Sequence, residues 1–173
     1  MAIPDQQMDG RALREAFGAY PTGVVAIVAQ IGGRLVGLAA SSFTSVSLAP
    51  PLVSVSIATS STTWPDLRRA EHLGVTVLAE GQGALSRQLS GPARDRFAGV
   101  AFDIADSGAV MLGGGAAEFD CTVSVEIEAG DHVIVLLQLH AAAVHRERQP
   151  LIFHRSEFPR LASNEDMMFG KEP

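Results

Sequence analysis

The chain has 173 residues, of which 47% are hydrophobic and 18% are charged. This length fits one domain, and the apolar composition excludes a disordered chain, which needs low hydrophobicity and high charge. The formal net charge is −6, with 13 basic residues against 19 acidic ones. That balance argues against nucleic acid as a partner, because such binding needs clustered Lys and Arg. The mean hydropathy of +0.21 is high for a monomer and predicts a large buried interface, as in a homodimer.

The ends of the chain and its one cysteine limit the cellular location and the disulfide or metal chemistry that we expect. Cys121 is the only cysteine, which excludes an internal disulfide and a zinc cluster of thiolates. The first residues lack the basic and apolar regions of a secretory signal, and no apolar run reaches the roughly 18 residues of a membrane span. We therefore expect a cytoplasmic protein with no membrane contact and no metal site. The domain is expected at 9–161, between flexible tails at 1–8 and 162–173.

Capping residues and turn signals place short helices along the chain. Asp9 is a good N-cap for the first helix, and the Tyr-Pro-Thr-Gly sequence at 20–23 ends it. Thr62 or Thr63 can cap a second helix, with Pro65 in its first turn. The helices are expected at 9–19, 62–73, 83–89 and 92–97.

Apolar and alternating runs predict about six or seven strands. Gly32–Gly33 and Gly130–Asp131 are signals for tight turns, which join antiparallel neighbours, and regular alternation of strands and helices is missing. We therefore expect a mainly β fold, an antiparallel six- to seven-stranded β-barrel with short peripheral helices. The strand segments are expected at 24–30, 35–40, 45–48, 53–57, 73–79, 121–128 and 132–145, with a last short strand from 151 and a loop or strand entry at 111–116.

A neutral, hydroxyl-rich stretch is the most informative feature of the sequence. Residues 35–65 contain no charged side chain but hold eight Ser and four Thr. Small hydroxyl residues at strand ends let the backbone approach a ligand and donate hydrogen bonds to phosphate or a polar heterocycle. The stretch favours a cofactor site, although Ser and Thr also line ordinary half-exposed sheets.

Several catalytic patterns are missing. The sequence has no G-x-G-x-x-G after a strand, no G-x-S-x-G, and no P-loop, since Lys171 is the only lysine. The histidines form no H-x-x-x-H or H-E-x-x-H pattern, and His132 and His140 are expected on one strand face with His145 on the other. Cys121 with a distant His could form a nucleophilic pair, but its place in an apolar strand face favours a core residue.

Four segments resemble the short-chain flavin reductases, the reductase components of two-component flavin-dependent monooxygenases. The similarity runs from about residue 9 to 161. Phe-Gly-Ala-Tyr-Pro-Thr-Gly-Val at 17–24 resembles the family's F-x-x-x-P-T-G-V, and 37–53 is similar to its long G-x-T-A-S-S-F-x-S-V-S-x-x-P-P-L segment. Gly130-Asp131-His132 matches the G-D-H motif, and 150–158 resembles the closing segment.

This resemblance implies an FMN-binding split barrel, a homodimer with flavin in a groove near the subunit interface. NADH would pass a hydride to flavin N5, and the reduced flavin would leave for a partner monooxygenase. No residue would act as a catalytic acid or base, because the protein positions the two cofactors. The resemblance does not distinguish FMN from FAD or NADH from NADPH, and it names neither the partner oxygenase nor its substrate.

The same resemblance implies which residues form the site. The 39–42 backbone would meet the isoalloxazine and ribityl chain, and Ser47 with the 56–62 segment would donate to ribityl and phosphate. Ser86 and Arg87 would lie near the phosphate or the adenylate arm. The nicotinamide nucleotide would contact Pro21, Thr22, His132 and Phe158, with Asp131 orienting its loop. The flavin residues are thus Ala39, Ala40, Ser41, Ser42, Ser47, Ser56, Ile57, Ala58, Ser60, Thr62, Ser86 and Arg87.

The chain departs from the family pattern at five positions. Ala39 replaces a usual Thr, which removes a hydroxyl near the flavin but keeps the backbone donor. Thr76 stands where Asn is frequent, Phe153 and Phe158 stand where Tyr is common, and Leu89 replaces an aromatic residue. These changes affect affinity and cofactor preference more than the basic activity.

Two other functions remain open from the sequence. One is a flavoenzyme that retains its flavin and acts on an organic substrate, and the other is a non-enzymatic flavin- or haem-binding module on the same barrel. Flavin that co-purifies tightly would favour the first. Function that survives substitution of His132 would favour the second. A purely structural role would leave the neutral Ser/Thr stretch without a reason.

Overall fold

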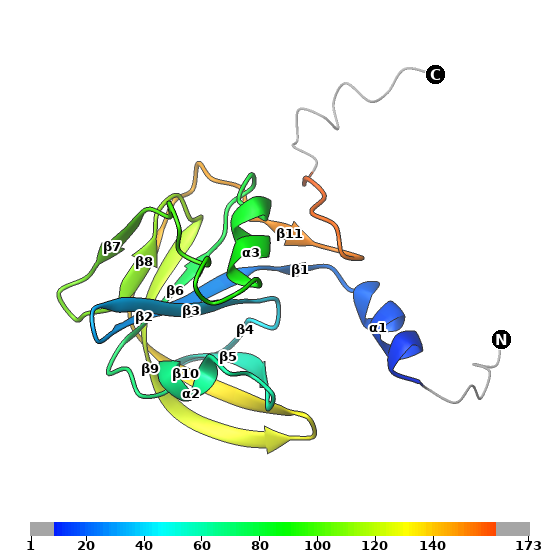
Figure 1. Ribbon diagram of the computed structural model, residues 1–173, viewed down its shortest axis with the longest axis horizontal. Coiled ribbons are helices and arrows are strands. Elements are labelled where there is room, and N and C mark those ends of the chain that lie inside the picture. Colours follow the sequence, from blue (N-terminus) through cyan, green and yellow to red (C-terminus); the bar gives the residue numbers. More distant parts are fainter. Residues whose placement is uncertain (1–8, 162–173) are drawn as a thin grey trace.

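The computed structural model describes residues 9–161, which form one curled sheet with short helices at its periphery (Figure 1). The tails predicted at 1–8 and 162–173 lie outside the described residues. Seven strands pair antiparallel in the order β3-β2-β6-β9-β10-β5-β4, which confirms the predicted mainly β, antiparallel architecture. These strands are β2 (Val25–Ile31), β3 (Arg34–Ala40), β4 (Thr44–Leu48), β5 (Pro51–Ala58), β6 (Leu73–Val77), β9 (Ala117–Ala129) and β10 (His132–Val144).

The two edge strands of this sheet, β3 and β4, follow each other in the chain. Only residues 41–43 join them, so the sheet must curve to bring its edges near each other. The turn between β2 and β3 has the predicted two-glycine form, because Gly32 and Gly33 both have positive φ, at 57° and 75°. Curvature therefore places the hydroxyl-rich segment where the sheet opens between its two ends.

Two short ribbons lie outside the main sheet and were not predicted as pairs. Strand β1 (Thr22–Gly23) pairs with β11 (Ile152–Phe153), and β7 (Phe102–Ile104) pairs with β8 (Val110–Leu112). Of these four strands, only β11 and a possible strand entry near β8 were predicted. Strands of two or three residues are too short to show a period in the sequence.

The helices confirm part of the prediction and correct the rest. Helix α1 (Gly10–Gly18) begins as expected, with the Asp9 carboxylate accepting from the Arg11 and Ala12 N–H groups. Helix α3 (Gly83–Leu89) also lies where predicted. None of the helices among residues 9–161 is long and apolar enough to span a bilayer.

Helix α2 (Trp64–Leu67) is much shorter than the predicted 62–73. Thr63 occupies the N-cap position, as one of the two predicted candidates, but its side chain accepts no capping hydrogen bond. The Ser61 hydroxyl instead accepts from the Thr63 and Trp64 N–H groups. The helix ends early because fully buried Leu73 must enter β6. The predicted resumption of a helix at 92–97 is wrong as well, since these residues form turns.

The core lies on both faces of β2, which is why the 24–30 run is almost continuously apolar. Val25 and Ile27 pack with residues from β5, β6 and β10 inside the curved sheet. Ala26 and Val28 pack with α3 and β8 on the other face. Burial on two faces fixes β2 and holds its neighbour β3, whose edge borders the site.

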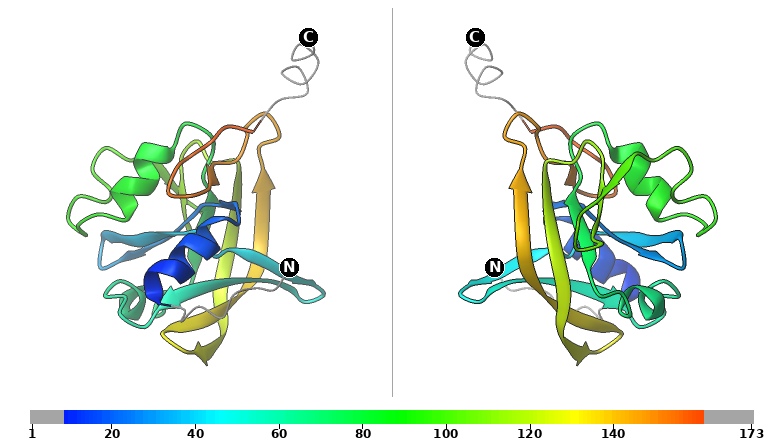
Figure 2. Two further views of the ribbon diagram at one scale, coloured as in Figure 1. Left: turned by 90° about the vertical axis from the view of Figure 1, so that its right-hand side faces the viewer. Right: turned by 90° about the vertical axis from the view of Figure 1, so that its left-hand side faces the viewer.

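The β9–β10 hairpin is the longest feature of the sheet (Figure 2). Its predicted row of alternating residues is buried at Cys121 but exposed at Val125 and Ile127, by 45% and 47%. The end of the hairpin thus extends past the core. Register shifts at 136/137 and 139/141 interrupt the strand period, so the predicted common face of His132 and His140 does not follow from strict alternation.

Candidate flavin-binding site

A groove of about 360 Å³ lies where β3 ends, between that edge and β5. Strand pairing explains why separate segments meet there. Residue His132 lies opposite Ala58 in the β10–β5 register, and both border the groove. The structure therefore brings together eight of the predicted residues with two others. The lining residues are Leu38, Ala39, Ala40, Ser41, Ser42, Ser56, Ile57, Ala58, Ser61 and His132.

A smaller hollow of about 130 Å³ also borders Ala39, Ala40 and Ser41. Ser86 and Ser90 reach it from α3 and the residue that caps its end, and Phe153 reaches it from β11. The 39–41 segment thus borders two cavities. The structure therefore places Ser86, a predicted site residue, next to the 39–41 backbone, which also borders the main groove.

The Ser42 hydroxyl is not free to serve a ligand. It donates to the Ser56 carbonyl oxygen at 3.1 Å and accepts from the Ser56 N–H at 2.9 Å. Ser41, in contrast, is exposed and borders both hollows. The two neighbouring serines therefore differ in role: Ser42 joins two backbone segments, whereas the Ser41 side chain remains accessible to a ligand.

Thr59 fixes the Gly-Asp-His turn against the end of β5. Its N–H and its hydroxyl both donate to the Asp131 carbonyl oxygen, at 2.9 and 3.0 Å. Thr59 and Ser61 both lie in the 56–62 run that was expected to donate to ribityl and phosphate, but neither was singled out, and the positioning role of Thr59 was not predicted. Ser61 lies three residues before Trp64, the first residue of α2, and its hydroxyl caps that helix. This spacing was the signal in the sequence that could have pointed to Ser61.

His132 Nδ1 lies 2.7 Å from Asp131 Oδ1. This hydrogen bond and the nearby imidazole charge lower the pKa of Asp131 below its usual 3.8. Asp131 is therefore an anion at neutral pH, and it hydrogen-bonds the ring of its neighbour His132 in the turn. His132 keeps 43% of its side chain exposed, so the ring remains accessible to a ligand in the groove.

Other predicted residues lie away from this groove. Phe158 packs against Gly83, Phe153 and the Arg87 guanidinium, whose carbon lies 4.8 Å from the ring centroid. It borders a separate hollow of about 510 Å³ with Glu80. Thr62 borders a fourth cavity, and Ser47 and Ser60 border none of these four hollows.

Thr22 and Pro21 occupy the start of the β1–β11 ribbon. Thr22 pairs with Phe153, which borders the smaller hollow. Its hydroxyl is buried and finds no hydrogen-bond partner among the described residues. A buried hydroxyl without a partner is costly, so this position has unused hydrogen-bonding capacity close to the site.

Cys121 is excluded as a nucleophile. Its side chain is fully buried, and burial together with the charge of Asp120 raises the pKa of its thiol to about 12. A buried thiol of this kind is almost entirely protonated and unreactive. The preference for a core residue is thus confirmed.

The comparisons with known proteins agree with this geometry. A model of the flavin reductase like domain matches residues 17–162. The stachydrine N-demethylase reductase subunit Stc3 of Rhizobium meliloti is 45% identical over 129 residues, 74% of this chain and 56% of that protein. A flavin reductase of Pseudomonas putida is 36% identical over 157 residues, 90% of this chain and 92% of that protein.

A solved structure is similar over nearly its whole length. It is the NADH:FAD oxidoreductase SgcE6 of Streptomyces globisporus in complex with NAD and FAD fragments. The two structures match with a TM-score of 0.85 and 32% identity, over 93% of this chain and 99% of that chain. From the sequence match and the common fold, we conclude that the chain belongs to the flavin reductase-like domain family.

Proposed function

We propose that the protein is an NAD(P)H:flavin oxidoreductase that transfers a hydride from NADH to FMN or FAD and supplies reduced flavin to a partner monooxygenase. One observation carries the proposal. Segments 39–42 and 56–58 and the distant His132 form a single groove in a chain of this family. The names of its relatives, a flavin reductase and a demethylase reductase subunit, support the same activity.

The chemistry of the groove fits a flavin ring. Ala39, Ala40 and Ile57 offer apolar contacts to a flat heterocycle, while Ser41 and Ser61 offer hydroxyl groups. None of the described residues that line the groove is a carboxylate, so no fixed negative charge there opposes the negative charge that a flavin ring gains when it accepts a hydride. A bound flavin would supply the hydride-accepting chemistry, and these residues would hold and orient it.

The nicotinamide nucleotide is assigned to the side of the groove bordered by the Gly-Asp-His turn. Asp131 fixes the ring of His132, and Thr59 fixes the turn, so His132 can contact the nucleotide without reorganising. Thr22, with its unpartnered hydroxyl, is assigned to the nicotinamide side as well. Both assignments need no proton transfer by the protein.

A homodimer is the second part of the proposal. Leu48 on edge strand β4 is 95% exposed, and Val125 and Ile127 are exposed at the end of the β9–β10 hairpin. Helix α1 stands to one side of the sheet and buries none of its residues (Figure 1). We infer that these exposed apolar side chains are covered by a second copy of the chain. Light scattering coupled to gel filtration gives the mass that tests this.

The activity is tested by NADH oxidation with catalytic protein and added FMN or FAD. Turnover by a colourless preparation would support a shuttled flavin. A yellow preparation without flavin turnover would instead indicate a retained flavin and an organic substrate. Absence of both turnover and flavin binding would overturn the proposal.

A substitution of His132 separates an enzyme from a binding module. We expect His132→Ala to lower kcat/KM for NADH by roughly 5- to 30-fold, which corresponds to about 1–2 kcal/mol of transition-state stabilisation. Flavin affinity should change little. Unchanged turnover in this variant would contradict the role of the Gly-Asp-His turn.

A further inference from the structure

The end of the β9–β10 hairpin carries a carboxylate on the face of the sheet where the core lies. Before this end, Val123 of β9 pairs with Leu137, and both belong to the core. The register shift between Leu136 and Leu137 is a β-bulge, and beyond it Glu126 lies opposite the fully buried Val135. Paired residues of an antiparallel ladder point to the same face, so Glu126 points to the core side.

This bulge reverses the predicted faces of the strand. In an unbroken strand period, Val125 and Ile127 would face the core together with Cys121. They are instead 45% and 47% exposed, whereas the side chain of Glu126 between them is only 20% exposed. The hydrophobic effect alone would favour the opposite arrangement. Bulges beside functional sites often redirect one side chain, and the contacts of Glu126 show what is redirected here.

Glu126 holds both ends of the short helix α2. Its Oε1 accepts from the Trp64 indole N–H at 2.8 Å, and its Oε2 lies 2.5 Å from an Arg68 guanidinium nitrogen. Trp64 is only 5% exposed and packs in the core, so its N–H needs an acceptor from the protein. Arg68 is half-exposed, and solvent weakens its ion pair. The Trp64 contact is therefore the main anchor between α2 and the hairpin.

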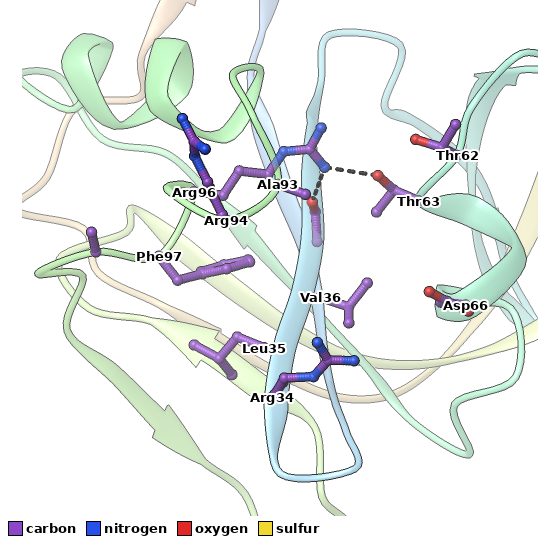
Figure 3. A pocket seen from close by; sticks show the side chains of 12 residues that line it. Arg34, Leu35, Val36, Thr62, Thr63, Asp66, Ala93, Arg94, Arg96 and Phe97 are labelled. Carbon is purple, nitrogen blue, oxygen red and sulfur yellow. Dashed lines mark hydrogen bonds between the residues drawn. The ribbon is translucent and has the colours of Figure 1, made fainter.

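A second set of contacts fixes the residue before α2. Arg96 donates to the Thr63 hydroxyl at 2.7 Å and to the Gly37 carbonyl oxygen at 2.8 Å (Figure 3). These residues border a cavity of about 630 Å³, which Arg34 of β3 and Arg94 of the 93–98 loop also line (Figure 3). The start of α2 is thus held by β3, by this loop and by β9.

The start of α2 in turn orients the Ser61 hydroxyl, which borders the flavin groove. Ser61 Oγ accepts from the Trp64 N–H at 3.2 Å and from the Thr63 N–H at 3.4 Å. A hydroxyl has two lone pairs and one proton, so an oxygen that accepts twice has only its proton left to offer. The Ser61 N–H is also used, since it donates to the Ala58 carbonyl oxygen at 2.9 Å. Toward a ligand, Ser61 is therefore a hydrogen-bond donor.

We propose that Glu126 is a positioning residue for the flavin, which keeps the Ser61 hydroxyl directed into the groove by holding Trp64 and the start of α2. The proposal rests on the proposed reductase function and adds to it a residue that does not line the groove. Without Glu126, a buried indole N–H loses its acceptor, and α2 has to shift to find another. The flavin group that Ser61 serves is an acceptor, either a ring carbonyl or a phosphate oxygen.

Flavin binding tests this role without any turnover. The full chain is titrated with FMN and with FAD, and the flavin fluorescence gives Kd. Glu126→Ala should weaken binding by roughly 3- to 10-fold, the factor that one lost hydrogen bond corresponds to. Glu126→Gln keeps an acceptor for the indole N–H and should bind within about twofold of the wild type.

Glu128→Ala is the matched control for the loss of charge. Glu128 lies opposite Val133, on the same face of β9 as Glu126. Its side chain forms no hydrogen bond or ion pair within the part of the chain that the structure describes. Wild-type flavin affinity is expected for Glu128→Ala. A loss equal to that of Glu126→Ala would mean that charge, and not the anchor on α2, is responsible, and would overturn the proposal.

A double-variant cycle shows whether Glu126 acts through Ser61. Ser61→Ala should weaken flavin binding, and the combined Glu126→Ala/Ser61→Ala variant should bind no more weakly than the weaker single variant, because one hydrogen bond is lost only once. Losses that multiply would contradict the path through Ser61. In steady-state kinetics, Glu126→Ala should raise KM for flavin and leave kcat at saturating flavin within about twofold.

Two further measurements separate positioning from a purely structural role. Trp64 is the only tryptophan, so its emission reports the loss of Glu126, while the melting temperature reports the stability of the fold. Altered emission or Tm with unchanged flavin affinity in Glu126→Ala would refute the positioning role. If Glu126→Ala does not fold, Trp64→Phe keeps a ring in the core and removes the N–H donor. Unchanged flavin affinity in Trp64→Phe would refute the role equally.

The positioning role and the reductase function fail in different ways. A protein that binds flavin with the expected variant effects but does not oxidise NADH would keep the positioning role and refute the function. A wild type that reduces flavin, with equal affinity and KM in Glu126→Ala, would refute only the positioning role. A wild type that neither binds nor reduces flavin would refute both.

Discussion

The Ser42 hydroxyl accepts a hydrogen bond from the Ser56 N–H at 2.9 Å and donates one to the Ser56 carbonyl oxygen at 3.1 Å. One side chain thus pairs both backbone groups of a residue in β5, as a neighbouring strand would. The contact joins the segment that leaves β3 to the opposite part of the sheet. It holds together the two walls of the proposed flavin groove.

We expect Ser42→Ala to destabilise the protein by about 2 kcal/mol, because two partly buried backbone groups lose their partner. For a chain of this size, that is a drop in Tm of roughly 4–8 °C. Thermal unfolding followed by circular dichroism measures it. Ser41→Ala is the matched control. Ser41 makes no such contact, so its Tm should hold while flavin binding weakens, and equal Tm losses in both variants would contradict the difference.

Gly74 lets β8 cross closely over β6. A Cβ at this position would lie 1.8 Å from the Val110 carbonyl oxygen, which the backbone cannot avoid without moving β8. We expect Gly74→Ala to lower the free energy of unfolding by about 3 kcal/mol or more. Gly23→Ala is the control, since nothing lies within 4 Å of its added Cβ. Urea denaturation compares the two, and a Gly74 variant as stable as the control would refute the close approach.

Asp120 makes the stability of the fold sensitive to acid. Burial alone would raise the pKa of this carboxyl, but hydrogen bonds from Ser107 and His72 and the nearby charges of His72 and His140 outweigh burial and lower the pKa below 3.8. A lowered pKa in the folded state stabilises the protein above the unfolded value. That stabilisation disappears as the pH falls through the folded pKa.

We therefore expect Asp120→Asn to lose about 1–2 kcal/mol at neutral pH, with the difference from wild type shrinking as the pH falls below 3.8 and through the lowered folded pKa. His72 Nδ1 lies 2.6 Å from the Asp120 carboxylate, and this hydrogen bond is what the variant weakens. Unfolding curves at several pH values give the difference. Asp103→Asn, at an exposed position of β7, should show none of this pH dependence. A constant difference at all pH values would contradict the role of the charge.

Cys121 should resist alkylation in the native protein. With a thiol pKa of about 12, roughly one molecule in ten thousand is a thiolate at pH 8, and the side chain is fully buried. Iodoacetamide followed by intact-mass measurement should find no label without denaturant and one label with it. Rapid native labelling would mean that the strand opens or that the thiol is accessible.

Local signals in the sequence predicted many elements correctly. Asp9 caps α1 as expected, and Gly32–Gly33 forms the turn between β2 and β3, because these features depend on neighbours in the chain. The 62–73 helix was wrong for a non-local reason. Residues after Leu67 have helical tendencies, but Leu73 has to join β6 to bury its side chain.

The site residues likewise divide into those that the sequence predicted and those that only the structure brings together. The resemblance to the flavin reductases implied 39–42, 56–58 and His132 as site residues, and the structure brings these together in one groove. It leaves Phe158 elsewhere, packed on Gly83 and Arg87. Composition could not show that the arginines of β3 and the 93–98 loop meet in one cavity, since they are about sixty residues apart in the chain.

The sequence by itself determined the class of fold, the turns and the chemical character of the neutral Ser/Thr stretch, because strand period, turn chemistry and the absence of charge are local properties. Only the tertiary structure decided which hydroxyls remain available to a ligand. Ser42 is used by Ser56, whereas Ser41 borders the groove. That difference arises from the curvature of the sheet, which brings its two edges close enough for one side chain to bridge them.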